Sequence, residues 1–210
     1  MRHGYRTLAD LTYKGDDPNP YRENYYKKTN AIEDDWTGLF DLTYALSETN
    51  GSDEQFLAQV EGIVNIEQWT RFMAADTLVG NREKGLYSGM GDDYALYAGT
   101  KDRRFWLVPH DLDTVLGQGD EGYVPDQDIL SYQDVPGLAR LMNHPDVKAL
   151  YFEQLRDMKR SIFTPEAMNT LIDDTLGDWV PAPVIDSMKL FVLERRYHVF
   201  EGSTPQVPRN

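Results

Sequence analysis

The chain has 210 residues, no cysteine, and 21 Lys and Arg against 35 Asp and Glu, which gives a net charge of −14 at pH 7. So acidic a surface repels the phosphates of nucleic acids and of anionic membranes, and we expect neither as a partner. The lack of cysteine excludes disulfides, zinc–thiolate sites and thiol nucleophiles, while a hydrophobic fraction of 40% is enough for a packed core.

The first part of the chain changes from an irregular to a helical pattern. Residues 1–33 are rich in tyrosine and polar residues with little periodicity, which predicts an irregular segment with an edge strand around residues 6–13. Apolar residues at helical spacing then predict three helices between residues 34 and 80. Capping-box signatures open the second and third of these helices, at Ser52 with Gln55 and at Asn65 with Gln68.

The second part contains one predicted hairpin among helices. Residues 94–98 alternate in polarity and residues 105–108 are apolar throughout, with a glycine-containing turn between them, which predicts a β-hairpin. A polar, acidic loop over residues 118–135 follows, and helical patterns continue from there to about residue 201. Residues 202–210 are typical of a linker or tail. The predicted fold class is therefore α+β and mainly α-helical.

Two aspartates at the end of the second predicted strand form the first candidate site. The apolar run 105–108 leads directly into Asp111 and Asp113, and Gly117 follows four residues later. In an extended segment, side chains two residues apart point to the same face, so both carboxylates are expected to face one point. Carboxylate oxygens are the ligands that Mg²⁺ prefers. The pattern favours a metal site, with a solvated turn as the alternative, because neighbouring aspartates also occur by chance in acidic chains.

A polar loop after the third predicted helix forms the second candidate site. This helix ends near residue 80, the loop contains Asn81, Arg82 and Glu83, and Asp93 precedes the predicted hairpin. The order resembles the protein-kinase catalytic region, in which a loop carries a base and an Mg²⁺-binding asparagine and a short hairpin delivers the metal-binding aspartate. Arg82 is a candidate phosphate contact, with a solvated loop as the alternative.

The stretch from about residue 11 to residue 199 resembles the C-terminal lobe of the CotH (spore coat protein H) kinase-like family. The matching pieces are residues 11–18, 25–29 and 36–39, the helix that runs into Gly80 and Asn81, residues 93–97, the block 109–117 and the last helix with residues 191–196. The most distinctive of them is the block 109–117, which resembles the family's Pro-Trp-Asp-x-Asp-x-x-x-Gly signature.

The resemblance implies an atypical kinase that uses ATP and a divalent metal, Mg²⁺ or Mn²⁺, to phosphorylate proteins. Residues 34–201 would form its kinase-like lobe, in which the small hairpin carries the metal-binding motif. Asp111 would bind the metal, and Asp113 would support it or bind a second ion. Asn81 would belong to the catalytic loop.

Two positions depart from the family pattern. Glu83 stands where the family has its catalytic aspartate, and a carboxylate displaced by about 1 Å can cost roughly 100-fold in rate. Asp93 stands where the family has an asparagine, so it keeps an oxygen ligand for cofactor or metal but adds negative charge. His110 replaces the family's tryptophan, which we interpret as a change in packing.

The resemblance also bears on the context of the chain. The nucleotide-covering lobe would precede residue 1, and no glycine-rich phosphate loop occurs in the sequence, so the chain alone is expected to bind nucleotide poorly and to be inactive. We expect a piece of a longer bacterial protein, secreted, at the cell surface or in the spore coat, whose partner is a protein substrate or a coat or surface protein.

Two alternatives stay open. One is a catalytically inactive homologue that serves as a scaffold or binding module, which Glu83 and Asp93 favour. The other is a glycosyltransferase that uses Asp-x-Asp to hold a metal and a sugar diphosphate. It would need a parallel nucleotide-binding sheet where residues 34–79 predict helices.

Overall fold

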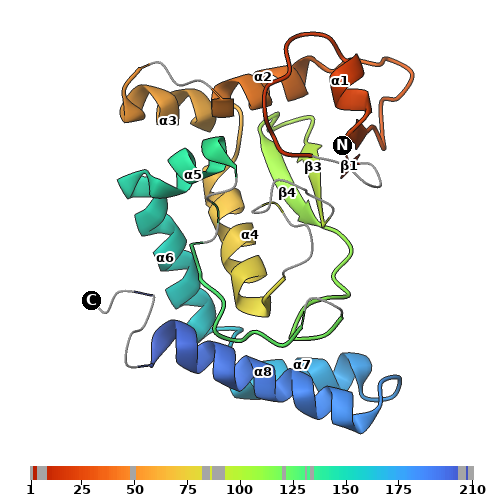
Figure 1. Cartoon of the computed structure of the whole chain (residues 1–210), viewed down its shortest axis with the longest axis vertical. Helices are drawn as coiled ribbons and strands as arrows, with labels where there is room; N and C mark the ends of the chain where they lie inside the picture. Colours follow the sequence, from red (N-terminus) through yellow and green to blue (C-terminus); the bar gives the residue numbers. More distant parts are fainter. Residues whose placement is uncertain are drawn as a thin grey trace. The chain divides into compact units, whose positions relative to one another are not determined.

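The structure, a computed structural model, describes residues 2–3, 9–47, 51–81, 86, 93–119, 122–130, 132, 135–202 and 207. It is mainly helical with a small sheet, and the predicted α+β class is confirmed (Figure 1). In chain order, the elements are β1 (Arg2–His3), α1 (Asn19–Arg22), β2 (Tyr25–Tyr26), α2 (Thr37–Ser47), α3 (Asp53–Glu61), α4 (Ile66–Val79), β3 (Tyr94–Ala98), β4 (Phe105–Pro109), α5 (Pro136–Asn143), α6 (Pro145–Arg160), α7 (Pro165–Leu176) and α8 (Ala182–Phe200).

The chain forms two compact units that alternate along the sequence. Unit 1 comprises Met1–Phe72, Lys84–Asp111 and Leu130–Lys148, and unit 2 comprises Met73–Glu83, Leu112–Ile129 and Ala149–Asn210. The boundary between them falls within α4 and directly after Asp111. The division at residues 33 and 201 that we expect from the sequence stays a prediction.

Unit 1 contains the sheet, in the order β2-β1-β3-β4 with antiparallel neighbours. Its main part is the predicted hairpin, in which Tyr94 lies opposite Pro109 and Ala98 lies opposite Phe105. The helices α2, α3 and the first part of α4 form residues 37–47, 53–61 and 66–72, in the region where a glycosyltransferase would need a parallel sheet. The predicted hairpin and the predicted helices are confirmed.

The predicted edge strand around residues 6–13 is wrong for its described part, residues 9–13, which form no strand. The backbone cannot stay extended there, because Leu11 has a φ of 53°. Side-chain hydroxyls, rather than a neighbouring strand, accept the backbone N–H groups of this segment: Leu11 donates to Tyr25 at 3.1 Å, Tyr13 to Ser47 at 2.9 Å and Lys14 to Tyr21 at 2.8 Å. The short strands β1 and β2 extend the sheet instead.

The two predicted capping boxes have different outcomes. At the start of α3, the Gln55 N–H donates to the Ser52 hydroxyl and the Gln55 side chain accepts from the Ser52 N–H, so the box is complete. At the start of α4, Asn65 accepts from the Gln68 N–H at 3.0 Å, but the Gln68 side chain bonds elsewhere. The second prediction is therefore right for the cap residue and wrong for its reciprocal partner.

Unit 2 is built mainly from helices. Figure 1 shows α7 and α8 side by side and antiparallel. Thr164 caps α7 by accepting from the Ala167 N–H at 3.1 Å, as expected for a Thr-Pro-Glu start. The buried face of α8 is apolar except for one charged residue, Arg195. A core of aromatic and aliphatic side chains thus surrounds a buried guanidinium.

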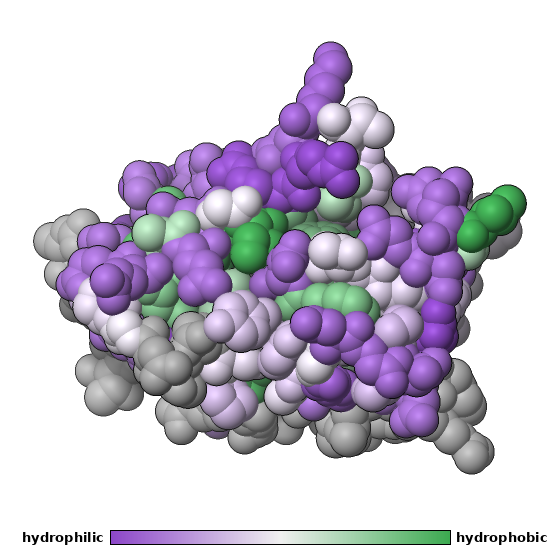
Figure 2. Space-filling view, turned by 90° about the horizontal axis from the view of Figure 1, so that it is seen from above, coloured by the Kyte–Doolittle hydropathy of each residue, from purple (hydrophilic) through white to green (hydrophobic). Residues whose placement is uncertain are grey.

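The surface is mostly hydrophilic on the face seen from above (Figure 2). On the face seen in Figure 2, hydrophobic residues occupy small, separated areas. In the part of the chain that the structure describes, we find no helix with both the length and the apolar character needed to cross a bilayer.

Candidate functional site

The strand β4 leads to Asp111. On the edge opposite β3, it is held by hydrogen bonds from α4 and from Asn65, the residue before α4. The Gln68 side chain pairs with Leu107 as a strand would, donating to its carbonyl at 2.7 Å and accepting from its N–H at 2.8 Å. The Phe105 carbonyl accepts from the Asn65 N–H at 3.1 Å and from the Trp69 indole at 2.9 Å. All these groups belong to unit 1, so the start of the Asp-x-Asp block is supported on a fixed strand.

The two aspartates of the block are exposed, but the geometry that we predicted for them is wrong. The strand ends at Pro109, and Asp111 has a φ of 53°, in the left-handed region. Side chains alternate only along an extended backbone, so the same-face argument for Asp111 and Asp113 does not hold. Aspartate tolerates this conformation better than most residues, but it still carries strain of the kind found at functional sites.

Asp93 lies opposite His110, at the same open end of the hairpin as Asp111. Its carbonyl accepts from the His110 N–H at 2.9 Å, which continues the ladder by one step beyond β3 and β4. The Asp93 residue is only 3% exposed. This candidate cofactor and metal ligand is therefore buried, in contrast to Asp111.

Asn81 is buried at the end of α4 in unit 2, where its side chain contacts two neighbours. Its Nδ2 donates to the Asp76 Oδ1 at 3.0 Å, and its Oδ1 accepts from the Thr114 Oγ1 at 3.5 Å. We call these three residues the Asn81 cluster. Because Thr114 directly follows Asp113, the cluster joins the end of α4 to the segment that carries the second aspartate.

The helix α8 packs against both backbone segments of the Asn81 cluster. A Cβ at Gly80 would lie 2.5 Å from the Phe191 ring, and a Cβ at Gly117 would lie 2.9 Å from it. Both glycines also have positive φ, 69° and 73°. Only glycine fits these two positions, so the glycine that closes the Asp-x-Asp block is explained by conformation and by close approach.

Arg195 links the same helix to α4. Its guanidinium donates to the Thr77 carbonyl, from Nε at 3.1 Å and from Nη2 at 2.9 Å, and also to the Pro125 and Gln127 carbonyls. The residue is fully buried. A cation at the carbonyl end of a helix also interacts favourably with the helix dipole. Arg195 therefore fixes the end of α4 and part of the acidic loop together.

Asp76 is the functional candidate that the sequence reasoning missed. The residue is half-buried, and desolvation of its carboxyl group raises its pKa from 3.8 to about 7, against the lowering effect of the hydrogen bond from Asn81. A signal was present, because Asp76 lies seven residues after Trp69 and three after Met73, on the apolar face of α4. An acid on a buried helix face is an uncommon placement.

Two of the predicted site residues lie outside the described part of the chain. These are Glu83, the candidate base, and Arg82, the candidate phosphate contact. Their predicted roles stay predictions.

The donor set suits a hard cation in its chemistry. Among the described residues, no three His, Cys, Asp or Glu side chains form a group that could hold a metal on their own. Mg²⁺, however, is commonly bound by only one or two carboxylates together with water and substrate phosphates. Asp111 and Asp113 are each exposed, so each carboxylate by itself is open to such an ion.

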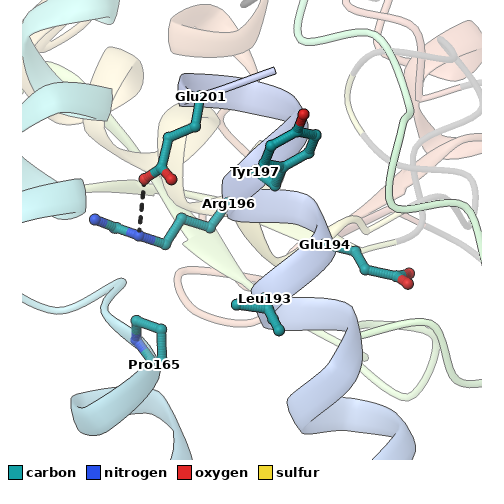
Figure 3. Close-up of a pocket in the computed structure, with 6 residues that line it drawn as sticks. All are labelled: Pro165, Leu193, Glu194, Arg196, Tyr197 and Glu201. Atoms are coloured by element: carbon teal, nitrogen blue, oxygen red, sulfur yellow. Dashed lines mark ion pairs between the residues drawn. The ribbon is translucent and has the colours of Figure 1, made fainter. Parts of the chain in front are cut away.

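Unit 2 also carries an open groove of about 550 Å³ on α8. The residues that line it are distant in sequence from the predicted site residues. Figure 3 shows Arg196 pointing toward Glu201, with Glu194 projecting from the opposite side of the helix. The Arg196 Nε lies 3.5 Å from the Glu201 Oε1, so these two charges are paired. The lining residues are Pro165, Leu193, Glu194, Arg196, Tyr197 and Glu201.

Comparison with known proteins finds one family. The model of the family described as CotH kinase protein matches residues 4–184. The match includes the Asp-x-Asp block and the Asn81 cluster, and it leaves out most of α8. No curated protein matches the chain.

Proposed function

Because the chain belongs to the CotH kinase family, we propose that it supports phosphoryl transfer from ATP to a protein substrate, with Mg²⁺ or Mn²⁺ held at Asp111 and Asp113. The observation that carries this proposal is the state of Asp111. It is an exposed carboxylate in a left-handed conformation, two residues after the end of a strand whose outer edge is held by the Gln68 side chain. Strain that persists on a well-supported element is typical of binding sites.

The chemistry of phosphoryl transfer fits this arrangement. The reaction needs positioning and charge neutralisation more than covalent chemistry. A bound divalent cation would supply the neutralisation of the phosphate charge. In a chain with a net charge of −14, a cation is also what would let phosphates approach the two aspartates.

Asn81 is proposed as a catalytic-loop residue. Its amide is fixed by Asp76 and Thr114, which supports a role in holding the segment around Asp113. Glu83 is proposed as the base on the strength of its position in the sequence alone. Asp93 is proposed as a further ligand, although its burial restricts access.

The test is transfer of labelled phosphate by the full-length protein, with Mg²⁺ or Mn²⁺ and ATP. We expect Asp111→Ala to abolish incorporation and Asp113→Ala to reduce it at least about 10-fold. Asp41→Ala, which removes an exposed aspartate on α2, is the matched control and should not change it. Incorporation that survives Asp111→Ala would contradict the proposed role of this residue.

A second candidate function is an inactive scaffold or binding module. The observation that favours it is Asp93, which replaces the family's asparagine with a carboxylate that is only 3% exposed. A folded full-length protein that incorporates no phosphate at saturating ATP and Mn²⁺ would support this function over the first. The partner would then be a coat or surface protein of a bacterium, which we propose from the family alone.

A further inference from the structure

The last turn of α4 ends in a Schellman motif, a glycine-based stop for helices. The Gly80 N–H donates to the Thr77 carbonyl at 3.3 Å, and the Asn81 N–H donates to the Asp76 carbonyl at 3.2 Å. Gly80 supplies the left-handed conformation that the motif needs, with a φ of 69°. In this motif the first residue of the last turn and the residue after the glycine come side by side, which here are Asp76 and Asn81.

These two positions usually carry apolar side chains in contact, and here they carry a polar pair. The Asn81 Nδ2 lies 3.0 Å from the Asp76 Oδ1, and Asn81 is only 3% exposed. Placing a carboxyl and an amide out of water costs free energy that an apolar pair would not. The raised pKa of Asp76, about 7, has the same origin in desolvation. Termination of α4 alone therefore does not account for the pair.

The pair fixes which way the Asn81 amide faces. Because the nitrogen donates to Asp76, the oxygen faces Thr114, whose Oγ1 lies 3.5 Å away. Thr114 is also 3% exposed, and the Leu116 N–H two residues later donates to the Val79 carbonyl at 2.7 Å. The segment that begins at Asp113 is thus attached to α4 by one side-chain bond and one backbone bond.

We propose that Asp76 is a positioning residue that orients the Asn81 side-chain amide and, through Thr114, holds the backbone next to Asp113. The proposal rests on the proposed phosphoryl transfer only for its catalytic consequence. The orientation of Asn81 is a property of unit 2 alone, since all four residues belong to that unit. Asp76 itself contacts Asn81 and is not assigned to the reacting atoms.

The first experiment compares three variants of the full chain by ¹⁵N–¹H correlation spectra and thermal unfolding. Asp76→Leu gives the motif its usual apolar residue, so the helix stop is kept while the acceptor is lost. Asp76→Asn keeps an oxygen that can accept from Asn81. Asp174→Leu makes the same exchange at an exposed position of α7. We expect Asp76→Leu to shift the Asn81 side-chain amide and the Asp113 and Thr114 backbone signals, Asp76→Asn to restore most of them, and Asp174→Leu to move none.

The proposal is overturned if Asp76→Leu leaves these signals in place, or if Asp76→Asn shifts them as much as Asp76→Leu does. A melting temperature that falls in Asp76→Leu while the Asp113 and Thr114 signals stay unchanged would identify Asp76 as a helix cap and nothing more.

The second experiment separates this inference from the proposed function. In the labelled-phosphate assay, Asp76→Leu should lower kcat about 10- to 100-fold and Asp76→Asn should restore it to within a few-fold. If the wild-type protein transfers no phosphate but the spectral shifts occur, the proposed function fails and the positioning of Asn81 stands. If the wild-type protein transfers phosphate and Asp76→Leu does so at the same rate, the proposed function stands and the catalytic consequence of Asp76 is wrong.

Discussion

The strand that leads to Asp111 and the helix end that holds Asn81 are supported in different ways. In unit 1, β4 is held by bonds that imitate a neighbouring strand, above all those of Gln68 to Leu107. In unit 2, the end of α4 is held by a buried guanidinium and by a polar side-chain cluster. Hydrogen bonds of the first kind lie at a part-buried edge, where water replaces them more readily, whereas loss of the second kind leaves buried groups without partners. We therefore expect substitutions at the helix end to cost more.

The largest effect is expected for Arg195→Met. It removes the donor to the Thr77, Pro125 and Gln127 carbonyls; Thr77 keeps the Gly80 N–H, and each acceptor left unsatisfied costs about 1–3 kcal/mol. We expect the free energy of unfolding to fall by about 4–5 kcal/mol, as measured by urea denaturation followed by circular dichroism. Arg160→Met, at an exposed position of α6, should stay within about 0.5 kcal/mol of the wild-type protein. Equal effects of the two substitutions would mean that the buried hydrogen bonds of Arg195 do not stabilise the end of α4.

The contrast also separates what the sequence could and could not predict. Elements whose signal is local were predicted: the alternating residues of β3, the apolar stripes of α2, α3, α4, α6 and α8, the Thr-Pro-Glu start of α7 and the capping box of Ser52 and Gln55. Periodicity and capping act within one element, so a single sequence contains all the information they need.

Features that depend on distant residues were not predicted. The Gln68 side chain does not complete the predicted capping box, because it bonds to both backbone groups of Leu107, 39 residues away. Residues 9–13 form no strand because side chains accept their N–H groups: the hydroxyls of Tyr25 and Ser47 those of Leu11 and Tyr13, and the Asp10 carboxylate that of Thr12. The left-handed conformation of Asp111 could not be predicted either, because nothing in the local sequence demands it. Such contacts arise only when the chain has folded.

For the candidate site, the roles of Asp111, Asp113, Asn81 and Asp93 stay predictions. The sequence did not indicate that Asn81 and Asp93 are buried, or that the Asn81 side chain bonds to Asp76 and Thr114. Asp76 was not predicted as a site residue, because residues on the apolar stripe of α4 are expected to be core residues. An acid on that stripe is the exception to its apolar pattern.

The second largest effect is a pH dependence of stability from Asp76. The folded state raises its pKa from 3.8 to about 7, so between these values the folded protein binds a proton that the unfolded chain has lost. Stability from this group is therefore highest below pH 4 and is lost as the pH rises to about 7, by about 3–4 kcal/mol. Asp76→Asn removes the titration, so its stability relative to the wild-type protein should rise over the same range. Denaturation midpoints of both proteins between pH 4 and pH 8 measure the difference, and a constant difference would show that Asp76 does not titrate there.

The third effect concerns the close approach of α8 to the helix end. Gly80→Ala adds a Cβ that would lie 2.5 Å from the Phe191 ring, at a position with positive φ. We expect a loss of about 3 kcal/mol in the free energy of unfolding, from crowding and backbone strain together. Gly122→Ala is the matched control, because Gly122 has a φ of 84° but no atom within 4 Å of an added Cβ. It should cost about 1 kcal/mol.

A double substitution separates the two causes. Phe191→Leu in the Gly80→Ala background removes the ring atoms that crowd the new methyl group but leaves the strained backbone unchanged. The loss caused by Gly80→Ala should therefore be smaller in the Phe191→Leu background than in the wild-type protein. An equal loss in both backgrounds would mean that conformation alone excludes a side chain at residue 80.

The smallest effect is expected at the strand edge in unit 1. Gln68→Met keeps the length of the side chain but leaves the Leu107 N–H and carbonyl to water, at a cost of about 1–2 kcal/mol. Hydrogen exchange of the Leu107 N–H should become about 10-fold faster, since about 1.4 kcal/mol corresponds to a factor of ten in a local opening equilibrium. Gln59→Met, on the exposed face of α3, should leave this exchange rate unchanged. If Gln68→Met instead costs as much as Arg195→Met, water does not replace the lost amide at this edge. The Gln68 side chain then stabilises β4 as much as the buried guanidinium stabilises α4.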